Sequence, residues 1–94
     1  MADTEYVLLH PVTVTFKNQQ GEREESIDKV SIREPRGKDM RALNNVHGDI
    51  AMSMEMVERL TNLDRVFVDE MHAADLAGIG EIIEGFMVPG KLTG

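Results

Sequence analysis

Residues 49–60 read DIAMSMEMVERL, which places methionine at every second position, at Met52, Met54 and Met56. Alternation is the period of a β-strand. However, Asp49 is a favourable N-cap, and the polar residues that follow fall on one narrow side at about 100° per residue. The stretch therefore predicts a helix whose apolar arc spans about 200°, against somewhat over 100° for an ordinary surface helix.

Such a wide apolar arc needs a second surface to cover it. The cover is another protein, another copy of the chain, or the last helix of the same chain. Core packing is the alternative use of the methionines, because their flexible thioethers fill irregular gaps. We predict a docking face formed by one stripe of this helix and the apolar side of the last helix. Its residues are Met52, Met56, Leu60, Leu63, Ile82, Phe86 and Met87.

The N-terminal third has the pattern of a β-hairpin. Residues 12–16 alternate between apolar and polar side chains, and Val30 and Ile32 repeat this period after a polar turn around Gly21. Ile27 is out of phase with Val30, which predicts a bulge in the second strand or a later start of that strand. Pro11 cannot donate to a ladder, so pairing before it is expected to be interrupted or to lie on an edge. The predicted strands cover about 7–17 and 26–33.

After Ile32 the apolar period changes from two to three and four, the period of helices. Pro35 ends the strand, and Gly48 separates two helical segments. The predicted fold class is α+β, a single small domain in which the N-terminal hairpin precedes three to four short helices. These helices cover about 38–47, 50–62, 65–71 and 73–87, and a flexible tail follows at 88–94.

Composition and charge exclude several classes of function. The 94-residue chain has no cysteine, so disulfide and thiol chemistry is absent. Residues 1–48 hold eight acids and seven bases (−1), and residues 49–94 hold nine acids and three bases (−6), in agreement with the net charge of −7. This distribution counts against nucleic-acid binding and favours a basic partner, or one that docks apolar side chains inside an acidic rim. No apolar run approaches the length of about 18 residues that a membrane span needs, so we expect a soluble cytoplasmic protein that makes no membrane contact.

The sequence contains no pattern typical of an enzyme. His10, His47 and His72 lie far apart in different predicted elements, and no metal-ligand spacing is present. The serines lack the context of an activated nucleophile, and no phosphate-binding loop follows a strand. We therefore predict no catalytic residue, no metal and no cofactor.

Several short motifs follow one another in the order typical of one family. An Arg-x-Pro-x-Gly-x-Asp turn is followed by a Leu-Thr-x-Leu segment at 60–63 and then by a helix led by an aspartate. Over about 7–87 the chain resembles the small tail assembly chaperones of Mu-like and related contractile-tailed phages. The motif residues are Arg33, Pro35, Gly37, Asp39 and Asp75.

The resemblance implies a function without catalysis. A chaperone of this kind binds the long, largely helical tape measure protein, keeps it soluble, and helps to assemble the tail tube around it. It would act in the host cell cytoplasm and be absent from the mature virion. The resemblance also implies a longer product made by ribosomal frameshifting, for which Gly90-Lys91 is the candidate shift site. The alternative is a small homodimeric adaptor or antitoxin-like regulator that associates through the face around Met52.

Overall fold

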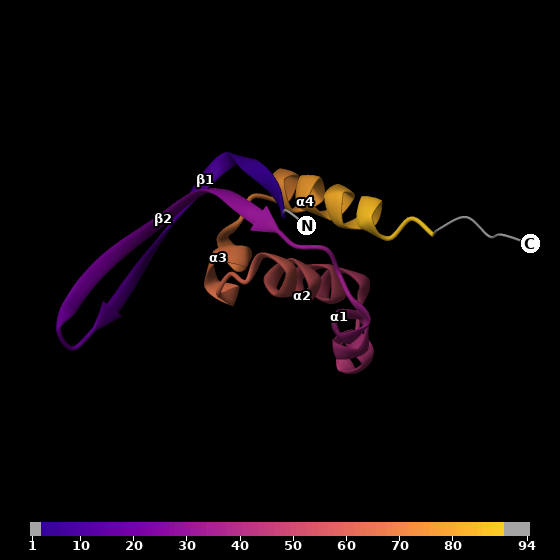
Figure 1. Ribbon diagram of the computed structural model, residues 1–94. Coiled ribbons are helices and arrows are strands. Elements are labelled where there is room, and N and C mark those ends of the chain that lie inside the picture. The colour runs from indigo at the N-terminus through magenta and orange to yellow at the C-terminus, as the bar shows by residue number, and fades with distance from the viewer. Residues whose placement is uncertain (1–2, 90–94) are drawn as a thin grey trace, which may run out of the picture.

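The computed structural model describes residues 3–89 and has the predicted α+β architecture (Figure 1). An antiparallel hairpin comes first and a set of short helices follows. The strands are β1 (Thr4–Asn18) and β2 (Gly21–Ile32). The helices are α1 (Gly37–Ala42), the 3-10 turn η1 (Leu43–Asn45), α2 (Asp49–Thr61), α3 (Arg65–Glu70) and α4 (Ala73–Phe86).

The hairpin is longer than the alternation of apolar residues indicates. β2 begins directly after a two-residue turn, because Asn18 pairs with Gly21, and residues 21–26 are exposed and polar. Backbone pairing and cross-strand polar contacts, such as the Thr13–Ser26 hydrogen bond and the Lys17–Glu22 ion pair, hold this part of β2, so no apolar pattern marks it. Gly21 has a φ of +131°, a backbone conformation that residues other than glycine rarely adopt.

A large bulge lies in β1 and not in β2, where we expected it. The register passes from Val7 opposite Lys29 to Val12 opposite Ile27, so residues 8–11 of β1 face a single residue of β2. Pro11 has no N–H to donate to the ladder. This register also explains why Ile27 is out of phase with the apolar residues that follow it.

The helical part also departs from the predicted bounds. The segment predicted as one helix over 38–47 is α1 followed by the 3-10 turn η1, and Asn44 and Asn45 in that turn have low helix propensity. Val88 and Pro89 follow α4 without helical structure, and the remainder of the predicted tail lies outside the described residues.

The core forms where the base of the hairpin meets the helices. β1 contacts α3 and α4, and β2 contacts α2, so helices cover the face of the hairpin that carries Leu8, Val12 and Val14. In Figure 1, α2 and α4 run side by side in opposite directions, and the far end of the hairpin extends away from the helices. This extension gives the molecule an elongated shape of 62 × 29 × 23 Å.

Candidate functional site

An apolar groove of about 280 Å³ lies between α2 and α4, with α1 and η1 at one end. Five of the seven methionines of the chain line it, together with other apolar side chains. The lining residues are Met40, Leu43, Met52, Ser53, Met54, Met56, Val57, Leu76, Gly80, Ile83, Glu84 and Met87. The groove is thus a methionine-rich surface with one charged residue.

The methionine groove has an exposed rim and a buried floor. Met40 and Met87, from α1 and the end of α4, are 50% and 42% exposed. Met52 and Met54 are half-buried, whereas Met56 is 5% exposed and belongs to the core. Flexible thioethers can rearrange around an apolar guest, so a lining of this kind adapts to more than one shape.

The structure brings only part of the predicted docking face into this groove. Met52, Met56 and Met87 line it. Leu60 is 2% exposed and is enclosed by its own chain, so it belongs to the core. Three further residues of the predicted face pack against the core without lining the groove, namely Leu63, Ile82 and Phe86.

The burial of Leu60 follows from the number of neighbours around α2. This helix contacts β2, α3, α4 and η1, so both apolar stripes of its C-terminal half are covered. Only its N-terminal half has open apolar surface, with Ile50 77% exposed and Met54 half-buried. Met54 lies on the other apolar stripe of the helix, with Ile50 and Val57, and so it was not predicted as part of the docking face. The spacing of Met40 and Leu43 indicated a helix, but nothing local indicated that this helix closes one end of a groove.

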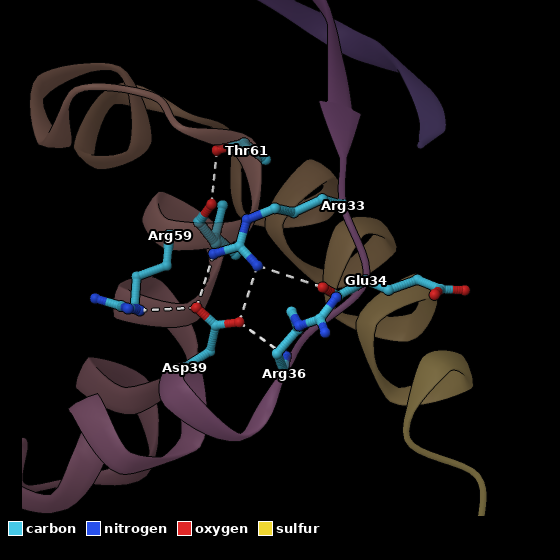
Figure 2. A network of polar contacts seen from close by, with 7 residues as sticks. Arg33, Glu34, Arg36, Asp39, Arg59 and Thr61 are labelled. Atoms are coloured by element: carbon cyan, nitrogen blue, oxygen red, sulfur yellow. Dashed lines mark hydrogen bonds and ion pairs between the residues drawn. The ribbon is translucent and has the colours of Figure 1, made fainter. Parts of the chain in front are cut away.

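One end of the groove is held in place by a buried carboxylate, that of Asp39 in the first turn of α1 (Figure 2). Arg33 donates to both of its oxygens, at 2.9 and 2.7 Å, and Arg59 of α2 donates through Nε at 3.2 Å. The backbone N–H of Arg36 donates to the same carboxylate at 2.8 Å. These donors, Arg33 foremost, hold the pKa of Asp39 well below its usual range.

This network accounts for the arginine and the aspartate of the Arg-x-Pro-x-Gly-x-Asp motif. Arg33 also donates its backbone N–H to the carbonyl of Leu60 at 3.0 Å, which ties the segment after β2 to α2. Pro35 is half-buried between the strand and α1. Gly37 begins α1, and a Cβ at that position would contact nothing within 4 Å. The motif therefore orients α1 and α2, which form part of the groove.

A second buried carboxylate, that of Asp75, joins α4 to the hairpin. It accepts hydrogen bonds from the backbone N–H groups of Leu9 and His10 at 2.8 and 3.0 Å, and from the hydroxyl of Tyr6 at 2.9 Å. Burial alone would raise the pKa of Asp75, but these three hydrogen bonds outweigh it and lower the pKa. The bulge of β1 thus satisfies its free N–H groups with a helix that starts about 65 residues later.

Gly78 permits α4 to approach the hairpin closely. A Cβ on Gly78 would lie 2.6 Å from the hydroxyl oxygen of Tyr6, so a side chain at this position would require Tyr6 to move. Tyr6 occupies this space and reaches Asp75. The same burial raises the pKa of Tyr6, and the hydrogen bond to Asp75 adds to the effect.

Two of the histidines, which are distant in sequence, meet in the fold. The rings of His10 and His72 stack with centroids 4.0 Å apart, beside the bulge. Nδ1 of His72 accepts a hydrogen bond from the N–H of Ala74 at 3.0 Å and thereby caps α4.

Within residues 3–89, no three side chains of His, Cys, Asp or Glu gather closely enough to hold a metal ion. No helix in that range is long and apolar enough to cross a bilayer.

The comparison with protein families gives one match. A family model described as phage tail assembly chaperone proteins, E, or 41 or 14, matches residues 6–88. Comparisons with curated proteins and with solved structures give no match. The matched range includes nearly all of the hairpin, both buried aspartates and the methionine groove. Because nearly the whole chain matches this model, the chain belongs to the family of phage tail assembly chaperone proteins.

Proposed function

We propose that this chaperone binds the tape measure protein of its phage, keeps it soluble, and releases it as the tail tube assembles. Membership of the family supports a role in tail assembly with a tail protein as partner. The tape measure is the specific partner that we propose, because a long helical protein exposes apolar helix faces before it is enclosed by the tube.

The observation that carries this proposal is the methionine groove. It is apolar, open at the rim, and lined by side chains that adapt to different guests. A chaperone has to hold a client before assembly and give it up afterwards, and adaptable apolar contacts suit such broad, reversible binding.

The charge of the chain supports a role in solubility. The excess of acids lies in residues 49–94, the half of the chain that contains α2 and α4. This half has nine acidic and three basic residues. A client held in the groove would carry this negative charge with it, and charge repulsion opposes aggregation of such complexes. We propose that the complex forms in the host cell cytoplasm and that the chaperone is absent from the mature virion.

Co-expression with the tape measure protein tests the proposal. With the chaperone present, the tape measure is expected in the soluble fraction and in a complex recovered through a tag on the chaperone. Purified virions should contain no peptide of the chaperone by mass spectrometry. A tape measure that is equally soluble with and without the chaperone would contradict the proposal.

We propose separately that a longer product arises by ribosomal frameshifting at Gly90-Lys91. These two residues lie outside the described residues. The gene tests it directly: a codon pair for these two residues without a slippery heptamer would remove the idea.

A further inference from the structure

The α4 side of the methionine groove carries an unbalanced negative charge. Glu84 is the one charged residue in the groove lining. It is exposed, and none of the ion pairs found among residues 3–89 includes it or Glu81, one turn earlier. α4 contains three acids and no base.

The position of Glu84 near the end of α4 strengthens this field. The carbonyl groups at a helix C-terminus carry a partial negative charge, which a base in the last turn normally offsets. α1 and α2 have such bases, Arg41 and Arg59, whereas the last turn of α4 has none. The Glu84 carboxylate and the C-terminus of α4 therefore both place negative charge at one end of the methionine groove. Together they favour a positively charged group on a binding partner.

The size of the groove limits what enters it. Its volume of about 280 Å³ is below the range of about 300–1,000 Å³ typical of sites that enclose a whole small ligand. It fits a few apolar side chains. The flanking helices, α2 and α4, have 13 and 14 residues, so each is about 20 Å long. A helix that lies on the groove can therefore contact them over about this length.

We infer that the groove binds an amphipathic helical segment of another protein, whose apolar side chains enter between α2 and α4 and whose Lys or Arg contacts Glu84. This inference rests on the proposed function and narrows it to one class of client segment. Apolar anchors at i, i+3 or i+4, and i+7 enter the groove. A basic residue on the flank of the same helix lies at the end of α4. A second copy of the chain suits the site less well, because each copy has a net charge of −7 and the same acidic rim.

Two synthetic helical peptides test the inference on the purified full-length protein. Both have about 18 residues, enough to form helix, and the same Leu and Met face. One has Lys and the other has Glu on the polar flank. Fluorescence anisotropy is expected to give a Kd about tenfold lower for the Lys peptide, and this preference should shrink when ionic strength rises from about 0.1 to about 1 M.

Two variants with the same change in net charge locate the contact. Glu84→Lys is expected to abolish the preference for the Lys peptide, and it should not weaken α4, because a base in the last turn is favourable. Glu24→Lys lies on the outer part of the hairpin, which points away from the helices, and should keep the preference (Figure 1).

Three results would overturn the inference: equal affinities for the two peptides, loss of the preference in both variants, or Lys-peptide binding that requires a dimer by sedimentation. These results are distinct from failure of the proposed function. Rescue of the tape measure without a charge preference would remove the inference alone, whereas peptide binding without rescue would remove the tape measure as the client.

Discussion

Arg33 and Asp39 form a two-point ion pair in which both terminal guanidinium nitrogens donate to the carboxylate, at 2.9 and 2.7 Å. The pair joins the end of β2 to the first turn of α1, and Arg59 of α2 donates to the same group. Asp39 is fully buried, whereas the two arginine side chains are about one-third exposed, at 34% and 32%. A single carboxylate thus fixes the relative positions of the hairpin, α1 and α2, and with them one end of the methionine groove.

Asp39→Asn should destabilise the protein by about 3 kcal/mol. Removal of one partner from a buried pair costs about 3–5 kcal/mol, and the lower value applies because water can reach the two arginines. Urea unfolding followed by circular dichroism measures the change. Asp69→Asn, at an exposed position of α3, is the control and should change the free energy of unfolding by less than about 0.5 kcal/mol. Equal losses in the two variants would contradict a structural role for the network.

Stability should fall in acid because the pKa values of both buried aspartates are lowered in the folded state. A lowered folded pKa means that the unfolded chain binds protons more readily. The stabilisation is therefore complete above the ordinary value of 3.8 and is lost as the pH falls below it. Urea unfolding at several pH values from about 7 down to about 3 tests this linkage. Asp75→Asn should be less stable at neutral pH and should have a shallower pH dependence. Parallel curves for the variant and the wild type would show that Asp75 does not contribute.

The order of the elements could be predicted from the sequence because periodicity is a local signal. The inner part of the hairpin, the start of α2 after Gly48 and the apolar side of α4 follow from alternation or helical spacing. The first residues of β2, 21–25, have no apolar alternation, so they were not predicted as strand. The bulge was assigned to the wrong strand because its partner, Asp75, lies more than 60 residues away in sequence.

The candidate site was less predictable because a groove depends on how helices pack. The methionines of α2 indicated more apolar surface than one neighbour can cover, and the N-terminal half of α2 has such surface. Leu60 was predicted to lie on that surface because the sequence does not indicate how many elements surround the C-terminal half of α2. Arg33, Asp39 and Asp75 were recognised as motif residues, but their shared role in joining the hairpin to the helices depends on contacts across the fold.

Gly78→Ala should destabilise the protein although alanine is the better helix former. The new methyl group would displace the Tyr6 hydroxyl and break its hydrogen bond to Asp75. A hydrogen bond to a charged group contributes about 1.5–3 kcal/mol, and the gain in helix propensity offsets about 1 kcal/mol of this loss. The expected net loss is therefore about 0.5–2 kcal/mol by thermal or urea unfolding.

Gly80→Ala is the matched control for Gly78→Ala in the same helix. A Cβ on Gly80 would meet nothing within 4 Å, so this variant should gain up to about 1 kcal/mol from helix propensity. If the two variants change stability in the same direction, the close approach of Tyr6 to α4 does not constrain residue 78.

Polar substitutions in the methionine groove should separate client binding from folding. Met52 and Met54 are half-buried, so the double variant Met52→Gln, Met54→Gln should remain folded while it loses most rescue of the tape measure in co-expression. Leu60→Ala, in the core at the other end of α2, should cost about 2–5 kcal/mol and act through unfolding. Circular dichroism and the soluble fraction of the tape measure distinguish the two effects.

The control for that double variant is Val7→Gln, Leu9→Gln, because both side chains are 70% exposed on the hairpin and lie outside the groove. This second double variant removes more exposed apolar surface than the first, because Met52 and Met54 are half-buried. If apolar surface anywhere on the molecule held the client, the two double variants would lose rescue equally. Retention of rescue by the hairpin variant and its loss in the groove variant would assign the client to the space between α2 and α4, and the reverse result would move the binding site to the hairpin.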